Sequence, residues 1–242
     1  MQLPKPVEIL AIGAHPDDIE LSCSGTLLKH KKLGRSFALV DLTMGQLGSR
    51  GSAALRLEEA RNAAELMGAD YRHNLGWEDG FFEESEEHLL ELVREIRLAR
   101  PRYILANAIS DRHPDHGRAG ALIRRATFLS GLVKVKSSYE GQSQAPHRPV
   151  HLLHYIQDRY IKPDVVVDIT AFYDMKLSAI SCYKSQFFNP ESEEPDTPIS
   201  SREFWDYIEA KDRYYGRMIG CKFGEGFVAE RTLGVERLDH II

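Results

Sequence analysis

The stretch VEILAIGAHPDDIELSCSGTLLKHKKLGRSFALVDL, residues 7–42, decides the fold class of the chain. Two short apolar runs, residues 7–13 and 36–42, have the pattern of buried strands. Between them, residues 19–33 have the pattern of a helix, and Gly34 is a suitable left-handed stop for it. A strand, a helix and a second strand at this spacing are typical of a parallel sheet.

The same alternation continues along the chain and predicts an α/β fold, with a doubly wound, mostly parallel sheet and helices on both faces. Further helices are expected over residues 53–67, 86–100, 117–130, 171–184 and 202–219, further strands over residues 70–75, 103–108, 150–156 and 165–169, and a polar loop over residues 134–149. Because no linker is visible, we expect one domain spanning residues 1–242. In such sheets the ligand site lies beyond the carboxyl ends of the strands, at the topological switch point.

The composition argues against several classes of protein. Hydrophobic residues make up 43% of the 242 residues, which is enough apolar mass to offset chain entropy. The net charge of −5 argues against a nucleic-acid-binding protein, which normally has a basic face. No apolar stretch approaches the roughly 18 to 20 residues that cross a bilayer, and residues 1–18 do not resemble a signal peptide. Three widely spaced cysteines predict a cytoplasmic location and leave any metal to histidine and carboxylate ligands.

Two loops that share a tripeptide follow expected strands. The sequence AHPDD, residues 14–18, comes directly after the strand at 7–13, and DRHPDH, residues 111–116, follows the strand at 103–108. Both loops therefore lie at the carboxyl ends of strands, and they converge on one point if the two strands are neighbours. The proline in each tripeptide fixes φ and stiffens the loop.

These loops contain the donors of a catalytic metal site. Imidazole and carboxylate groups suit Zn²⁺ better than Mg²⁺, although Fe²⁺ or Co²⁺ can occupy such donors too. Catalytic zinc commonly takes three protein ligands, so His15, Asp18 and His116 would complete a set and leave Asp17 as a base. The alternative is that Asp17 and Asp18 only cap a helix. Two such motifs, each after a strand, favour the metal site.

The two motifs also carry a family resemblance. The segments AIGAHPDDIELSCSGTLLK (11–29) and DRHPDHGRAG (111–120) resemble the PIG-L/LmbE-like family of zinc-dependent N-deacetylases, and the resemblance covers nearly the whole chain. The segments DLTMGQLGSRG (41–51), YKSQFFNP (183–190) and DTPISSREF (196–204) are similar to the members that deacetylate N-acetylglucosaminyl-malate in bacillithiol biosynthesis. The resemblance implies a Rossmann-like fold of LmbE type, one zinc ion per chain and a homo-oligomer, a hexamer in this family.

The resemblance implies a role for each motif residue. Asp17 is the general base, and protonated His113 acts as an electrophile or acid that Asp115 orients. The implied zinc ligands are His15, Asp18 and His116. Some relatives have a tyrosine near the start of the last helix that stabilises the oxyanion. Phe204 stands at that position here, with Tyr207 nearby, so we assign no residue to this role.

A malate group carries two carboxylates, which require cations, and the planar fork of arginine suits them. Arg50 and Arg56 lie in and after the loop that follows the second strand, and Arg148 precedes the strand at 150–156. In the family, arginines at the positions of Arg56 and Arg148 line the pocket. The alternative for each is a solvated or surface-paired arginine. The acidic loop 189–200 would repel a carboxylate substrate and is expected to lie off the pocket.

Three further residues are candidates for roles at the site. Asn107 and Asp111 flank the second motif and are expected to orient the metal ligands. Trp77 could stack on a sugar or anchor the core.

Several functions stay open beside deacetylation of the malate conjugate. The substrate could be another N-acetyl sugar or a mycothiol-type conjugate. A metal-dependent phosphoesterase would need more bridging carboxylates than the two loops contain. A binding module for a metal or a sugar would not need a spare base such as Asp17. In each enzymatic case the expected partner is a small-molecule substrate, with no nucleic acid and no membrane.

Overall fold

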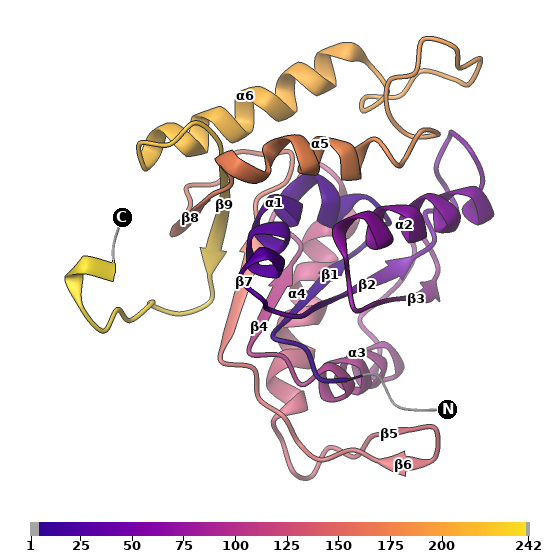
Figure 1. Cartoon of the computed structure of the whole chain (residues 1–242). Coiled ribbons are helices and arrows are strands. Elements are labelled where there is room, and N and C mark those ends of the chain that lie inside the picture. Colours follow the sequence, from indigo (N-terminus) through magenta and orange to yellow (C-terminus); the bar gives the residue numbers. More distant parts are fainter. Residues whose placement is uncertain (1–4, 241–242) are drawn as a thin grey trace.

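The computed structural model describes residues 5–240 and contains a seven-stranded sheet with the strand order β3-β2-β1-β4-β7-β9-β8 (Figure 1). The strands are β1 Ile9–Gly13, β2 Phe37–Thr43, β3 Tyr71–Trp77, β4 Tyr103–Ala106, β7 His151–Tyr155, β8 Val165–Asp168 and β9 Gly224–Ala229. The first five strands of the chain in this sheet pair in parallel, whereas β9 pairs antiparallel with both β7 and β8. The predicted α/β fold with a mostly parallel sheet is confirmed.

The helices cover both faces of this sheet. They are α1 Asp18–Lys32, α2 Ala53–Met67, α3 Glu86–Ala99, α4 Pro114–Ser130, α5 Tyr173–Ile180 and α6 Arg202–Met218, with 3-10 turns at Thr170–Phe172 and Leu238–His240. In Figure 1, α1, α2 and α5 lie on one side of the sheet, and α3 and α4 lie on the other. α6 contacts β8 and β9 at one edge. None of the described helices is both long and apolar enough to span a bilayer.

Three stretches differ from the sequence prediction. The pattern does not predict β9, because its sequence GEGFVA begins with two glycines around a glutamate instead of an apolar run. The helix expected over residues 171–184 begins instead with a 3-10 turn, and α5 already ends at Ile180. The loop expected over residues 134–149 contains a short hairpin of two strands with two residues each, β5 (Ser138–Tyr139) and β6 (Gln142–Ser143).

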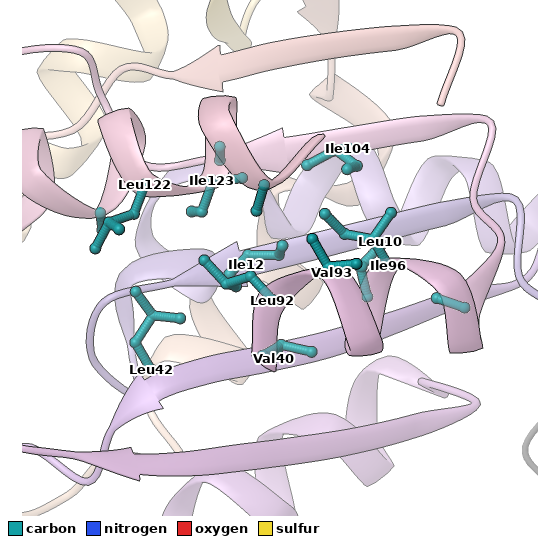
Figure 2. Packing of buried hydrophobic residues seen from close by; sticks show 14 of the residues in the cluster. Leu10, Ile12, Val40, Leu42, Leu92, Val93, Ile96, Ile104, Leu122 and Ile123 are labelled. Atoms are coloured by element: carbon teal, nitrogen blue, oxygen red, sulfur yellow. The ribbon is translucent and has the colours of Figure 1, made fainter. Parts of the chain in front are cut away.

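The central strands are buried on both faces, as parallel strands usually are. Figure 2 shows the α3/α4 side, where side chains of β1 and β2 pack against the two helices. The labelled members of this cluster are Leu10, Ile12, Val40, Leu42, Leu92, Val93, Ile96, Ile104, Leu122 and Ile123. Each fully buried aliphatic side chain contributes about 1.5–3 kcal/mol, so the cluster holds β1, β2 and β4 in fixed positions.

The strand order reverses next to β1. The chain winds from β1 through β2 to β3 and then returns to β4, which pairs with the free side of β1. The register aligns Ile9 with Tyr103 and Ala11 with Leu105, so both strands end at the same edge of the sheet. The two motif-bearing strands are therefore neighbours, which is the condition under which their following loops converge, and these loops meet at the switch point.

Candidate active site

Asp17 lies at the N-cap position of α1 but turns its carboxylate away from the helix. Its φ is 113°, a left-handed conformation that costs a non-glycine residue roughly 1–3 kcal/mol. The residue is 3% exposed, and Nη2 of Arg56 donates to its Oδ2 over 2.6 Å. Within the described chain, the Asp17 side chain makes no capping bond. The capping alternative is therefore wrong for Asp17.

Two carboxylates orient His15. Its Nε2 lies 3.0 Å from Oδ1 of Asp79 and 3.3 Å from Oδ2 of Asp115. With the proton on Nε2, the ring donates to these oxygens, and the lone pair of Nδ1 is free on the side of Asp18, whose Oδ2 lies 3.7 Å away. Histidines that bind metals usually donate their second N–H to a carboxylate in this way.

His116 has the same arrangement with its two ring nitrogens exchanged. Its Nδ1 lies 2.5 Å from Oδ2 of Asp111, and its Nε2 lies 3.1 Å from Oδ1 of Asp18. Asp111 therefore orients His116, as the sequence predicts. The separations of 3.7 and 3.1 Å between Asp18 and the two imidazoles bracket the roughly 3.4 Å between ligands of a tetrahedral zinc ion. The donor set thus fits a zinc-like cation in its chemistry and in these two separations. Among the described residues, the groups whose possible donor atoms all lie within 4.8 Å of one another are His15 with His113 and His116, and His15 with Asp79 and Asp115.

The electrostatics of this cluster favour positive charge. Burial lowers the pKa of His15, but its bonds to Asp115 and Asp79 more than compensate, and the pKa is raised to about 9. Burial also lowers the pKa of His116, while the charge of Asp18 and the bond to Asp111 raise it to about 10. The surrounding carboxylates therefore stabilise a cation at this point, which is what a divalent metal site requires.

Asp17 is separate from this donor set and has the properties of a base. Burial raises the pKa of its carboxyl group to about 7, although the charge of Arg56 opposes this shift. A general base works best when its pKa lies near the operating pH.

The geometry corrects the expectation for His113 and Asp115. The Asp115 carboxylate accepts from the Gly80 N–H over 2.9 Å and from Arg118 over 2.8 Å, besides its contact with His15. It is the backbone N–H of Asp115 that donates to Nδ1 of His113, over 3.3 Å. Burial and the neighbouring imidazoles lower the pKa of His113. Asp115 therefore orients His15, and His113 is neutral with its proton on Nε2, so it can still donate.

Two polar residues that the sequence analysis missed support the ligands. Gln157, after β7, donates from Nε2 to Oδ1 of Asp18 over 3.0 Å. Asp79, after β3, joins His15 to the backbone N–H of Leu47, which donates to its Oδ2 over 2.8 Å. Asn107 donates to Oδ2 of Asp18 over 2.9 Å, as expected. Both missed residues follow a strand at its carboxyl end, so the rule that identified the motifs applies to them too.

A cavity of about 280 Å³ opens above these groups. Its floor contains the motif residues His15, Asp17, Asp18, His113 and His116. Its walls come from the loops after β2, β4 and β7, from α2, from the segment before α6 and from α6 itself. They include Leu47, Ser49, Arg56, Arg112, Asp158, Ile199, Phe204, Tyr207, Ile208 and Lys211. The hydroxyl of Tyr207 donates to the Asp158 carbonyl.

Only one of the three predicted arginines lines this cavity. Arg56 does so, but Arg50 is not among the described lining residues, because its guanidinium donates to the Ser185 carbonyl over 2.8 Å and to Ser192 Oγ over 2.7 Å. Arg148 packs on the Phe128 ring, 5.0 Å from its centroid, at the far end of α4. The 17 residues of α4 place that end roughly 25 Å from the second motif. The expected pocket positions of Arg50 and Arg148 are therefore wrong for a single chain.

The positions of the loop 189–200 and of Trp77 decide two further expectations. The loop 189–200 does line the cavity, through Thr197, Pro198 and Ile199, so the prediction that it lies off the pocket is wrong for its last part. That part carries no charge, while Glu194 accepts from the Gly51 N–H over 2.5 Å. Trp77 is 5% exposed within the α3/α4 cluster, which supports its role as a core anchor.

Comparisons with known proteins agree with this geometry. The family model described as GlcNAc-PI de-N-acetylase (PIG-L) matches residues 10–127. The diacetylchitobiose deacetylase of Thermococcus kodakarensis is 30% identical, over 97% of this chain and 88% of its own. The probable N-acetyl-alpha-D-glucosaminyl L-malate deacetylase 2 of Bacillus cereus is 26% identical, over 74% and 83%. The crystal structure of the conserved protein TT1542 from Thermus thermophilus has a TM-score of 0.83 and 34% identity, and covers 95% of this chain and 98% of that chain. The chain therefore belongs to the PIG-L (LmbE-like) family of deacetylases.

Proposed function

We propose that this chain is a zinc-dependent hydrolase that removes the acetyl group of an N-acetylglucosamine conjugate, with N-acetylglucosaminyl-malate as its substrate. The observation that carries the proposal is that the cavity floor holds a buried carboxylate beside the possible metal donors but apart from them. In this proposal His15, Asp18 and His116 would hold one zinc ion, whereas the buried carboxylate of Asp17, which pairs with Arg56, would stay outside the donor set. A binding module would not need this spare base.

The residues of the chain have distinct tasks in such a reaction. Zinc, when bound, supplies a Lewis acid and lowers the pKa of water. Asp17 accepts a proton from the attacking water, and Arg56 holds its carboxylate in place. Neutral His113 donates from Nε2 to the oxygen that gains charge, a contribution of roughly 3–4 kcal/mol per donor. As the C–N bond breaks, the proton taken by Asp17 passes to the departing amine, which leaves acetate and a free amine.

The choice of the malate conjugate as the substrate is the more specific part of the proposal. It is supported by the resemblance of the segments 41–51, 183–190 and 196–204 and by the similarity to the malate deacetylase of Bacillus cereus. The similarity to the diacetylchitobiose deacetylase spans more of the chain and favours a neutral disaccharide as the second candidate. The three free cysteines agree with a cytoplasmic location.

The decisive experiment measures free-amine release from N-acetylglucosaminyl-malate, N,N′-diacetylchitobiose and N-acetylglucosamine, each with and without a chelator. Chelator-sensitive release from the malate conjugate alone, restored by Zn²⁺, is the expected result. Faster release from diacetylchitobiose would overturn the malate assignment and keep the deacetylase. Release that persists in chelator would overturn the metal site, and release of inorganic phosphate from phosphate esters would favour the phosphoesterase.

A homo-oligomer is part of the same proposal, because Arg148 lies too far from the cavity of its own chain. If Arg148 binds substrate, it must do so in the cavity of a neighbouring copy, because its own chain places it over the Phe128 ring. Chains carrying Asp17→Asn and chains carrying Arg148→Ala should each have low activity, and co-expressed mixtures should regain part of it. Mixtures that stay as inactive as their parents would contradict the exchange of Arg148 between copies.

A further inference from the structure

Lys211 differs from the other cations that line the cavity. Arg56 pairs with Asp17 over 2.6 Å, and Arg112 pairs with Asp158 over 2.5 Å. Within residues 5–240, Lys211 has no carboxylate within ion-pair distance. Its Nζ donates to the Gln157 carbonyl over 3.2 Å, so an ammonium with three N–H donors has two to spare.

The position of Lys211 relates it to the metal donors. It contacts the backbone oxygen of Gln157, and the side chain of the same glutamine donates to Asp18 over 3.0 Å and lies 3.4 Å from Nε2 of His116. One residue therefore separates the Lys211 ammonium from the donor set. Tyr207, one helical turn earlier, places its ring 5.9 Å from Nζ and forms the adjacent wall.

Each carboxylate that acts on Lys211 is paired with another cation: Asp212 and Glu225 with Lys176, and Asp158 with Arg112. The next residue, Asp212, faces the interior instead, where Nζ of Lys176 lies 2.7 Å from its Oδ2. Burial lowers the pKa of Lys211 and Lys176 adds to this shift, while Asp212, Glu225 and Asp158 oppose it. A partly buried ammonium beside a second cation is stabilised when an anion binds it.

We propose that Lys211 is a specificity-determining residue that binds a carboxylate on the anomeric substituent of the substrate. This inference rests on the proposed deacetylation and names the group that recognises the acidic part of the conjugate. In an N-acetylglucosamine conjugate, the acetamide on C2 and the substituent on C1 are attached to adjacent carbons. When the acetamide lies at the metal donors, the substituent on the adjacent carbon can face Lys211, which contacts the same Gln157 as the donors.

The test compares Lys211→Gln with the unmodified chain on three substrates: N-acetylglucosaminyl-malate, neutral methyl N-acetyl-α-glucosaminide and N-acetylglucosamine 1-phosphate. We expect KM for the malate conjugate to rise by about tenfold or more, because a charged hydrogen bond is lost, while kcat changes little. The neutral glycoside should be unaffected, and Lys211→Arg should restore most of the affinity. Lys222→Gln, at an exposed lysine outside the cavity lining, is the control for the loss of one charge.

Two kinetic outcomes and one binding outcome would overturn the inference. An equal loss on the acidic and neutral substrates would mean that Lys211 only positions the loop around Gln157. A larger effect on the phosphate than on the malate conjugate would assign the site to phosphate esters. Titration of the zinc-loaded chain with L-malate, followed by calorimetry, gives a readout that needs no turnover. Binding that is weakened at least tenfold in Lys211→Gln supports the site even if no acetylated sugar is hydrolysed, and unchanged binding contradicts it.

Discussion

In the loop after β1 the helix begins three residues beyond the histidine, at Asp18, whereas in the loop after β4 it begins one residue beyond the histidine, at Pro114. The tripeptide His-Pro-Asp is the same in both loops. In the first loop its aspartate, Asp17, precedes the helix in a left-handed conformation. In the second loop the aspartate, Asp115, lies inside the first turn of α4. The starting point of the helix therefore decides which way each carboxylate points.

The two aspartates consequently have different surroundings. Asp17 faces the cavity, with the buried Arg56 as its cation. Asp115 faces His15 and is held by Arg118, whose side chain is 37% exposed. In the proposed mechanism, one loop therefore presents a carboxylate for chemistry, and the other uses its carboxylate to orient His15 of the first. The same residue in the same motif does not define a role without the local backbone.

The largest expected effect separates the two aspartates by activity. Asp17→Asn should lower kcat by about 10²–10⁴, because an amide cannot accept the proton of the attacking water, while the metal content stays near one per chain. Acetate release and metal analysis of the purified variant test both parts. Asp115→Asn, the matched change in the other tripeptide, should keep far more of kcat at saturating zinc. Equal losses in the two variants would contradict the proposed division of roles.

Variants of the two arginines that pair with these aspartates should differ in their free energy of unfolding. Arg56→Gln leaves the Asp17 carboxylate buried beside a neutral group, and breaking a buried pair costs roughly 3–5 kcal/mol. Arg118→Gln removes an arginine that is 37% exposed, and the buried Asp115 keeps its contacts with His15 and the Gly80 N–H, so a cost of about 1 kcal/mol is expected. Urea unfolding of the two variants at equal zinc concentration measures the difference. If Arg118→Gln cost as much as Arg56→Gln, the contrast in burial would not explain the contrast in role.

Features that depend on short segments could be predicted from the sequence. β1 and β2 are continuous apolar runs because both of their faces are buried, and the motifs follow their strands directly. β9 lacks such a run for a tertiary reason. A Cβ at Gly224 would lie 2.9 Å from the backbone nitrogen of Gly216 on α6, so close helix–strand packing, and not strand propensity, selects the residue.

Contacts between distant residues account for what the sequence could not predict. His15 meets Asp79 across 64 residues, and Asp18 meets Gln157 across 139. A local pattern does not show which carboxylate or amide completes such a pair. Arg148 illustrates the same limit, because its place depends on the length of α4 and on the end of β7 that it precedes.

A smaller effect should appear in the affinity for the metal. Asp79→Asn and Asp115→Asn each remove one of the two carboxylates on Nε2 of His15, and changes to such supporting groups typically cost about 10–100-fold in metal affinity. Competition with a zinc chelator of known affinity gives the dissociation constants. Glu91→Gln, which alters a carboxylate bonded to Trp77 outside the site, is the control and should leave the affinity unchanged.

The smallest expected effect concerns the two prolines of the tripeptides. Replacing either proline with alanine frees the unfolded chain and should cost about 0.4–1 kcal/mol. Pro114 is the first residue of α4, a position where alanine is also accepted, so Pro114→Ala should change stability alone. Pro16 restricts His15 before it, and its carbonyl accepts from Nε of Arg56 over 3.0 Å. Pro16→Ala should therefore also lower kcat several-fold. Unfolding midpoints and acetate release, measured on the same samples, separate the effect on stability from the effect on kcat. If both variants retained full kcat, the rigidity of the first loop would be a matter of stability only, and the left-handed Asp17 would be held in place by Arg56 and the packing around it.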